Sequence, residues 1–291
     1  MKSVLVLLST YNGEKYLAQL LESVLHQQDV NVRIFARDDG SSDRTVEILE
    51  KYAINNDIEI VQGENIGYAD SFWWLLSEAS GSDYYAFADQ DDIWKPRKLV
   101  TEIDCIDDQE CAALCTGNVV PVDATGKPID INLFPVHGPL TLSESLRQSI
   151  LPGCSFLFNE EARCLAARHR GRLESHDWAL YTIVTACGVV EYCEEPGLYY
   201  RLHGGNTIGS TDAFQVLRDR IVRFLGKSEH VRSRFAQDLL AEYGDVVGEE
   251  ERAVIGLMAE ANQSFANRFK LATCPEKTGL PFRLSALLGK V

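Results

Sequence analysis

Several features that would assign a protein to a common class are missing from this chain of 291 residues. No stretch approaches the roughly 18 consecutive apolar residues needed to cross a bilayer. The eight cysteines show no paired C-x-x-C spacing, so the sequence does not indicate a structural zinc site. Basic residues are scarce as well. There are 28 lysines and arginines against 43 acidic residues, a net charge of -15, which argues against a general nucleic-acid binder.

Glycine-rich phosphate motifs are also missing. Only Gly13 follows the first apolar run, so the Gly-x-Gly-x-x-Gly pattern of dinucleotide-binding folds does not occur there, and no Gly-x-x-x-x-Gly-Lys motif indicates a nucleotide triphosphatase. The apolar run itself, residues 4–8, is too short for a signal peptide and is typical of a buried strand. We therefore expect a cytoplasmic protein whose cysteines are reduced thiols.

Strand and helix patterns alternate along the first 120 residues. A continuous apolar run at 4–8 is followed by helical spacing of leucines over 14–27. This alternation predicts an α/β fold with a mostly parallel sheet that helices cover on both sides. Further strands are expected at 32–35, 58–61, 84–88 and 112–120, further helices from Asp43 and from Gly67, and C-terminal helices at 212–225, 228–246 and 249–267.

Polar clusters follow three of these strands, at residues 10–12, 38–41 and 89–92. Ligands bind at the carboxyl ends of parallel strands, so we expect the clusters to meet at one edge of the sheet. The Asp-Asp-Gly-Ser cluster at 38–41 is also a common turn composition, and that alternative stays open. The Asp-Gln-Asp-Asp cluster at 89–92 crowds three carboxylates, which repel each other unless a cation lies among them. A divalent metal ion is one explanation and a solvated acidic loop is the other.

Seven short motifs occur along the chain in a fixed order: Ser9-Thr10-Tyr11-Asn12-Gly13, Arg37-Asp38-Asp39-Gly40-Ser41-Ser42-Asp43, Asn65-Ile66-Gly67, Phe87-Ala88-Asp89-Gln90-Asp91-Asp92-Ile93-Trp94, Pro152-Gly153-Cys154-Ser155, Ser175-His176-Asp177-Trp178 and Tyr200-Arg201-Leu202-His203-Gly204-Gly205-Asn206. Together they resemble the inverting glycosyltransferases of family 2, and more narrowly their bacterial rhamnosyltransferase-like branch. The resemblance implies a GT-A fold, which is Rossmann-like, over residues 1–210. Residues 1–120 would form its nucleotide-binding half, 121–210 its acceptor half, and 211–291 a helical extension.

The resemblance also implies a nucleotide-sugar site with a metal ion at this edge of the sheet. Asp39 is expected to contact the base or ribose, Asp89 to face the ribose, and Asp91 to ligate Mg²⁺ or Mn²⁺. The other residues expected to bind the nucleotide sugar are Thr10, Tyr11, Asn12 and Gln90.

Asp177 is implied to be the general base. Its carboxylate would take the proton of the acceptor hydroxyl as that oxygen attacks the anomeric carbon from the face opposite the diphosphate, which inverts the configuration. A metal ion would stabilise the charge that grows on the leaving diphosphate. An acidic residue near the start of a helix is also favoured by the helix dipole, and this structural explanation stays open.

The neighbours of these residues supply candidates for the acceptor and diphosphate sites. Trp94 and Trp178 lie beside the metal and base residues, where an indole face can stack on a sugar, and His176 is expected on the same acceptor side. His203 is expected to complete the metal shell or touch the diphosphate, and Arg201 to neutralise it. A structural role is the alternative for a lone histidine such as His203.

The last residues, 268–291, are locally basic in an acidic chain. They hold five lysines and arginines and one glutamate, a local charge of +4, among several leucines and phenylalanines. Such a tail can lie on the inner face of an anionic membrane. A helix that packs on the protein or forms a homodimer is the alternative.

The resemblance therefore implies an inverting hexosyltransferase that depends on a dTDP- or UDP-sugar. The reaction that it favours is transfer of rhamnose from dTDP-rhamnose to a glycan or lipid-linked acceptor of a bacterial surface polysaccharide, such as O-antigen or capsule. Two other functions stay open. A sugar-nucleotide pyrophosphorylase also uses acidic clusters after parallel strands, and a catalytically silent scaffold could bind other synthesis enzymes through the C-terminal helices.

Overall fold

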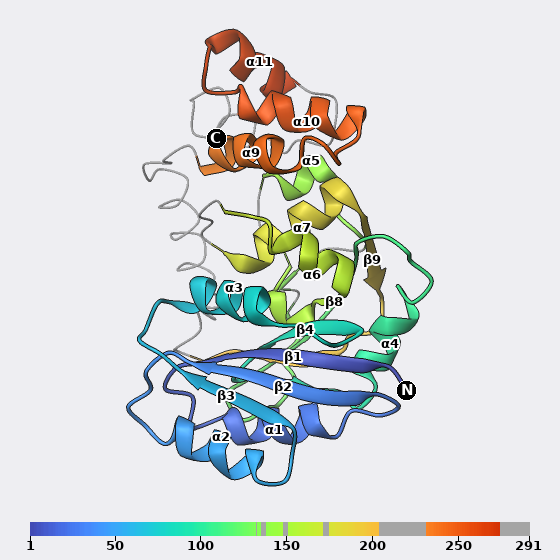
Figure 1. Ribbon diagram of the computed structural model, residues 1–291. Helices are drawn as coiled ribbons and strands as arrows, with labels where there is room; N and C mark the ends of the chain where they lie inside the picture. Colours follow the sequence, from blue (N-terminus) through green and yellow to red (C-terminus); the bar gives the residue numbers. More distant parts are fainter. Residues whose placement is uncertain (132, 135–137, 148–150, 171–174, 204–230, 274–291) are drawn as a thin grey trace.

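The computed structural model describes residues 1–131, 133–134, 138–147, 151–170, 175–203 and 231–273 (Figure 1). Within these residues, seven strands form the main sheet in the order β3-β2-β1-β4-β8-β6-β9, and β8 alone runs antiparallel to its neighbours. A second sheet has the order β5-β10-β7. This confirms the predicted α/β fold with a mostly parallel sheet.

The elements alternate along the chain as expected. The strands are β1 (Ser3–Thr10), β2 (Asn31–Asp38), β3 (Ile58–Gln62), β4 (Tyr84–Asp89), β5 (Ile93–Trp94), β6 (Ala113–Gly117), β7 (Val120–Val122), β8 (Leu157–Asn159), β9 (Val189–Cys193) and β10 (Leu198–Arg201). The helices are α1 (Leu17–Leu25), α2 (Thr45–Ala53), α3 (Tyr68–Glu78), α4 (Lys98–Asp104), α5 (Leu142–Ser145), α6 (Glu160–Ala166), α7 (His176–Cys187), α9 (Val231–Tyr243), α10 (Glu249–Ala259) and α11 (Phe265–Thr273), with a short 3₁₀ helix η1 (Gly153–Ser155).

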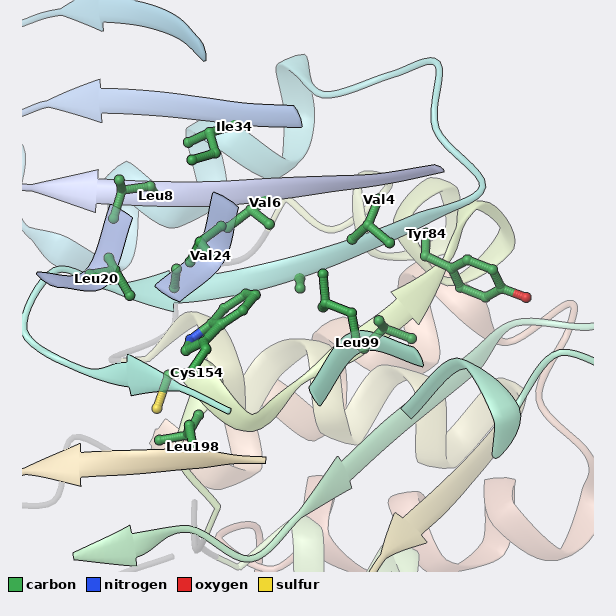
Figure 2. Packing of buried hydrophobic residues seen from close by; sticks show 14 of the residues in the cluster. Val4, Val6, Leu8, Leu20, Val24, Ile34, Tyr84, Leu99, Cys154 and Leu198 are labelled. Carbon is green, nitrogen blue, oxygen red and sulfur yellow. The ribbon is translucent and has the colours of Figure 1, made fainter. Parts of the chain in front are cut away.

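Helices cover both faces of the main sheet, α1 and α2 on one side and α3, α6 and α7 on the other (Figure 1). Successive side chains of a strand point to opposite faces, so the continuous apolar run of β1 serves both sides. Val6 and Leu8 pack toward α1, and Val4 lies on the same face beside Tyr84 of β4, as Figure 2 shows. Leu5 and Leu7 belong to the core under α3.

The C-terminal helices α9, α10 and α11 stack on α5 and α7 (Figure 1). They share a third hydrophobic core in which Trp178 and Ile183 of α7 pack with Phe235 and Leu239 of α9. None of the described helices combines the length and the apolar character that a membrane span requires.

Two predicted elements are each divided in the structure. The expected strand at 112–120 is β6 in the main sheet and β7 in the second sheet, and the chain turns beyond Gly117, where a Cβ would lie 2.4 Å from the carbonyl oxygen of Cys193. The expected helix at 249–267 ends at Ala259, and Ser264 starts α11 because its hydroxyl accepts the N–H of Asn267 at 3.1 Å. The expected helix at 212–225 and the proposed domain boundary near residue 210 lie outside the described residues.

Candidate active site

The three polar clusters meet at one edge of the main sheet. Strands β2, β1 and β4 are parallel neighbours, with Thr10 paired with Asp38 and Ser9 with Asp89. Their carboxyl ends therefore lie side by side, as the sequence predicted.

Gln90 ties the loop after β4 to the loop after β1. Its side-chain carbonyl accepts the N–H of Tyr11 at 2.9 Å, and its amide group donates to the carbonyl of Tyr11 at 3.0 Å. This pair of bonds requires a glycine at position 13, because a Cβ there would lie 2.2 Å from Oε1 of Gln90. Gln90 thus shapes the loop as well as lining the site.

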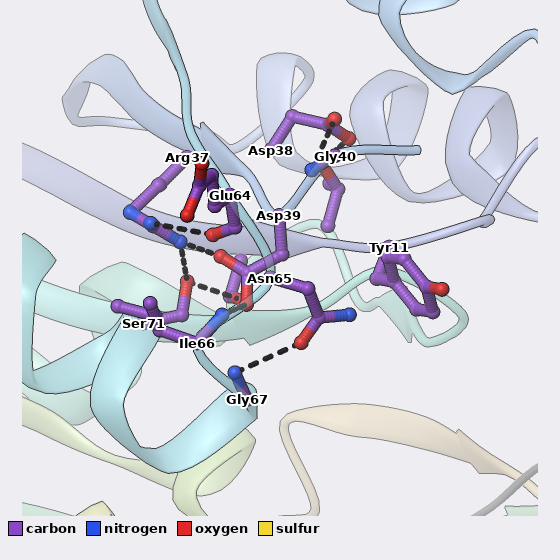
Figure 3. A network of polar contacts seen from close by, with 12 residues as sticks. Tyr11, Arg37, Asp38, Asp39, Gly40, Glu64, Asn65, Ile66, Gly67 and Ser71 are labelled. Carbon is purple, nitrogen blue, oxygen red and sulfur yellow. Dashed lines mark hydrogen bonds and ion pairs between the residues drawn. The ribbon is translucent and has the colours of Figure 1, made fainter. Parts of the chain in front are cut away.

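The loop after β2 is organised by Asp38. This buried carboxylate accepts the backbone N–H groups of Gly40 and Ser41 at 3.1 and 2.8 Å (Figure 3) and the hydroxyl of Thr10 at 2.9 Å. Thr10 is 1% exposed, and its side chain holds the two loops together. Its expected contact with the nucleotide stays a prediction. The turn interpretation of the 38–41 cluster is therefore correct for Asp38.

Between these loops lies an open cavity of about 330 Å³. Asp91 and His203 contact each other on its wall, with Nε2 of His203 2.7 Å from Oδ2 of Asp91, and the ring of Tyr16 packs 4.9 Å from the imidazole. Residues 91 and 203 are far apart in sequence, and the structure brings their side chains into contact. The shared metal site stays a prediction. The lining residues are Asn12, Gly13, Lys15, Tyr16, Gln90, Asp91 and His203.

The donor atoms of Asp91 and His203 fit a divalent transition metal. Carboxylate oxygen suits Mg²⁺ and Mn²⁺, while imidazole nitrogen favours the transition metal over Mg²⁺. A second candidate group, Asp89, Asp92 and Cys154, has its ligand atoms within 4.8 Å of one another but is less suited to a hard ion. Its thiol is a soft ligand, and Oδ1 of Asp92 already accepts the backbone N–H of Arg201 at 3.0 Å.

Arg201 does not face the diphosphate position as expected. It is 1% exposed, and its guanidinium donates to the backbone carbonyls of Asp91 and Ala124 at 2.7 and 3.1 Å and to Oε1 of Gln19 at 2.6 Å. The guanidinium therefore positions the acidic loop from behind. Lys15, which the sequence reasoning missed, is the exposed cation on the cavity wall.

Burial and mutual repulsion perturb the acidic cluster. Burial, followed by the carboxylates of Asp91 and Asp177, raises the pKa of Asp89 to about 7. Burial and the charges of Asp91 and Asp89 also raise the pKa of Asp92 well above its usual range. The thiol of Cys154 lies within 4.8 Å of a carboxylate oxygen of Asp89, and the adjacent residue Gly153 donates its N–H to Asp177, so the predicted base lies near the acidic cluster although it is far away in sequence.

Asp177 lies in the first turn of α7, against η1. Its carboxylate accepts the N–H of Trp178 at 2.7 Å and the N–H of Gly153 at 3.2 Å. Gly153 leaves the necessary room, because a Cβ there would lie 3.0 Å from Cβ of Asp177 and 2.8 Å from Nε2 of His176. Burial raises the pKa of Asp177 to about 6, which suits a base that works near neutral pH.

The three residues expected to contact the acceptor have buried side chains, and their role at the acceptor stays a prediction. Trp94 is 3% exposed in the core, and Trp178 donates its indole N–H to the carbonyl of Ser145 at 2.6 Å. His176 stacks on Phe72 at 4.1 Å, and burial lowers its pKa to about 3, so the imidazole is neutral. The exposed aromatic at this position is Tyr68, with its ring 6.2 Å from that of His176.

Comparison with known proteins identifies the family and the fold. The family described as Glycosyl transferase family 2 matches residues 5–162. The dTDP-rhamnosyl transferase RfbG of Shigella flexneri is 27% identical over 230 residues, covering 74% of this chain and 78% of that protein. An uncharacterized glycosyltransferase of Nostoc sp., alr2836, is 28% identical over 219 residues, covering 69% and 65%. In structure, Staphylococcus aureus TarS 1–349 in complex with UDP-GlcNAc matches with a TM-score of 0.59 at 18% identity, covering 100% of this chain and 88% of TarS, which shows a shared fold.

Proposed function

This chain belongs to glycosyl transferase family 2, and we propose that it transfers a sugar from a nucleoside diphosphate to a glycan or lipid-linked acceptor with inversion. Rhamnose from dTDP-rhamnose is the donor that we favour. The relative RfbG is a dTDP-rhamnosyl transferase, and it matches most of both chains. TarS, which shares the fold, binds UDP-GlcNAc, so UDP-sugars are the second class of donor to test.

One observation carries this proposal: the contact between Asp91 and His203 on the wall of an open cavity at the carboxyl edge of the sheet. A nucleotide sugar needs cations for its diphosphate and a base for the incoming hydroxyl. The first need is met by Lys15 and a metal ion at Asp91 and His203, and the second by Asp177. Bound there, Mn²⁺ would offset the negative charge that develops on the diphosphate.

The other residues of the site bind or position the reactants. Lys15 pairs with the diphosphate, and Tyr11, whose side chain is 48% exposed, offers its ring to the nucleoside. Asn12 is committed to the loop, since its side-chain oxygen accepts the N–H of Ser42 at 2.9 Å, and it shapes the pocket through this bond. The family resemblance assigns Asp39 to the base and Asp89 to the ribose, and both assignments stay predictions.

Asp177 receives the proton of the acceptor hydroxyl. With a pKa of about 6, its carboxylate is ionised at pH 7.5 and is still basic enough to take a proton as the C–O bond forms. The backbone N–H groups of Gly153 and Trp178 fix its orientation. The exposed ring of Tyr68, beyond His176, is available to the acceptor sugar on this side.

Contact with an anionic membrane is part of the proposal. Phe265 and Phe269 are 63% and 53% exposed, one helical turn apart on α11, and Arg268 and Lys270 share that turn. The helix has no acidic residue, and the sequence that follows keeps the local charge positive. Exposed aromatic rings flanked by cations match the interface of a bilayer that holds the lipid-linked acceptor. A homodimer through the same surface is the competing outcome.

The proposal is tested by incubating the protein with dTDP-rhamnose and with UDP-sugars, Mn²⁺ and octyl glycosides as acceptors. Release of nucleoside diphosphate together with an inverted glycoside product is expected. Release of pyrophosphate from a sugar phosphate and a nucleoside triphosphate would instead favour a nucleotidyltransferase. No turnover of any donor, with wild type equal to Asp91→Ala, would favour a silent scaffold.

A further inference from the structure

The ring of Tyr16 forms part of the cavity wall and contacts two polar residues, one at the end of β10 and one just beyond it. Its centroid lies 4.9 Å from that of the His203 imidazole, with 31° between the two ring planes, and 4.6 Å from the central guanidinium carbon of Arg201. Tyr16 is far from both residues in sequence, so only the folded protein brings these side chains together. The proposed reaction gives Tyr16 no role of its own.

The backbone holds this ring in a fixed place. Tyr16 immediately precedes α1, where its N–H donates to the carbonyl of Gly13 at 3.1 Å and its own carbonyl accepts the N–H of Gln19 at 2.9 Å. Leu17 and Leu20 of the same turn are fully buried in the core beneath β1. The first turn of α1 therefore cannot shift without disturbing that core, and it presents the ring from a rigid element.

The ring, and not the hydroxyl group, is what Tyr16 contributes to the cavity. The hydroxyl is buried and has no hydrogen-bond partner among the residues that the structure describes. A buried polar group without a partner costs stability, so this hydroxyl does not explain the residue. Two aromatic rings at this separation attract each other through their faces and edges, which fixes one against the other.

His203 is the residue that needs such a support. An imidazole can rotate about two side-chain bonds, and it ligates a metal only when its nitrogen points at the ion, so an outer partner usually fixes the ring of a ligating histidine. Tyr16 packs against this imidazole while Nε2 of His203 lies 2.7 Å from Oδ2 of Asp91. Arg201 depends on the ring less, because its guanidinium already donates to Gln19 and to the carbonyl of Asp91 at 2.6 and 2.7 Å.

We propose that Tyr16 is a positioning residue for the metal site, and that its ring holds the His203 imidazole in the orientation that joins Asp91 around a divalent ion. The inference rests on the proposed function, in which Asp91 and His203 hold that ion. It adds the first turn of α1 to the site, and Tyr16 itself touches neither the ion nor the reacting atoms.

The experiment measures the dissociation constant of Mn²⁺ for the full chain by calorimetry at pH 7.5, with and without UDP. Tyr16→Leu should raise it about 10–100-fold, the loss that follows removal of an outer partner of a ligand. The ammonium of Lys15 lies 4.7 Å from the same ring, so the measurement without UDP separates metal binding from any change at the diphosphate. Tyr16→Phe keeps the ring and loses only the unpartnered hydroxyl, so it should stay within about twofold of wild type.

Tyr52→Leu is the matched control. Tyr52 is a partly buried tyrosine on α2 whose hydroxyl donates to Glu22 at 2.7 Å, and it does not line the cavity, so Mn²⁺ affinity should remain that of wild type.

A double-mutant cycle tests whether Tyr16 acts through His203. His203→Ala removes the ligand itself, so in that background, with UDP present, Tyr16→Leu should change Mn²⁺ affinity by less than about twofold. An equal effect in both backgrounds, wild-type affinity in Tyr16→Leu, or an equal loss in Tyr16→Phe would overturn the inference alone. If Tyr16→Leu does not fold, Tyr16→Met takes its place in the cycle. A wild-type protein that binds no Mn²⁺, with or without UDP, would overturn the metal site of the proposed function together with this inference.

Discussion

Replacing Asp177 by asparagine tests the proposed base with the least change in shape. Asparagine has the same size and keeps an oxygen that can accept the N–H of Trp178, which lies 2.7 Å from Oδ1 of Asp177 in the wild type. It cannot take a proton. Removing a general base typically lowers the rate by about 10²–10⁴-fold, and we expect this loss in sugar transfer. Asp177 does not line the cavity, so the dissociation constant of UDP should stay within about twofold of wild type.

The pH dependence of transfer follows from the raised pKa of this group. Burial raises the pKa of Asp177 to about 6, so the ionised form that acts as base is lost as the pH falls through 6. The wild-type rate should therefore rise through about pH 6 and level off above it. The residual rate of Asp177→Asn should lack this step.

The stability of Asp177→Asn tests whether burial is the cause of the raised pKa of Asp177. The pKa of Asp177 is higher in the folded state, so the folded protein binds the proton more tightly than the unfolded chain does. The stability that this proton binding adds is lost as the pH rises through about 6. At pH 8 the ionised carboxylate therefore costs up to about 3 kcal/mol. Asparagine removes that cost, but its NH₂ group faces the N–H of Gly153 and cannot accept that hydrogen bond, which lowers the stability by about 1 kcal/mol. Urea unfolding at pH 8 should show a gain of about 2 kcal/mol that shrinks as the pH falls from 6 toward 4.

Asp57→Asn is the control for both measurements, since the Asp57 side chain is 71% exposed and remote from the site. Transfer by Asp177→Asn within about tenfold of wild type, or a pH step near 6 that survives the substitution, would reject Asp177 as the base. If Asp177→Asn is less stable than wild type at pH 8, burial is not the cause of the raised pKa of Asp177.

Other parts of the molecule give further expectations. Asp91→Ala should lose the gain in UDP affinity that Mn²⁺ gives in calorimetry, and an unchanged gain would remove Asp91 from the metal shell. Lys98→Met leaves the Glu102 carboxylate, 2.7 Å away in the wild type, buried without its cation, so urea unfolding should show a loss of about 3–5 kcal/mol that removal of both charges largely recovers. Serine at both Phe265 and Phe269 should abolish flotation with phosphatidylglycerol vesicles, whereas flotation equal to wild type would contradict membrane contact.

Some of the site could be predicted because it depends on local patterns. Apolar periodicity locates β1, β2 and β4, and parallel strands place their carboxyl ends at one edge whatever the packing around them. The acidic cluster therefore had to lie beside the loop after β1. Lys15 was also visible in the sequence, as a cation directly after the first loop. No periodicity marks it as part of a cavity wall, however.

Side-chain burial was not predictable in the same way. Trp94 and Trp178 follow the acidic motifs in sequence, yet an indole has enough apolar surface that neighbouring helices and strands enclose it, and both side chains point into cores. Arg201 was expected at the diphosphate, but its guanidinium donates to two backbone carbonyls behind the acidic loop and to the side chain of Gln19. The exposed aromatic ring beside His176 is that of Tyr68, which lies on a helix that begins far from Asp177 in sequence.

The sequence by itself determined the order of strands and helices, the family, and the edge of the sheet where the polar clusters meet, because these follow from short-range patterns and from the direction of parallel strands. Only the tertiary structure decided which of those polar groups reach the cavity. Contacts between His203 and Asp91 and between Gly153 and Asp177 join segments that only packing brings together. Burial in the folded protein also raises the pKa of Asp177.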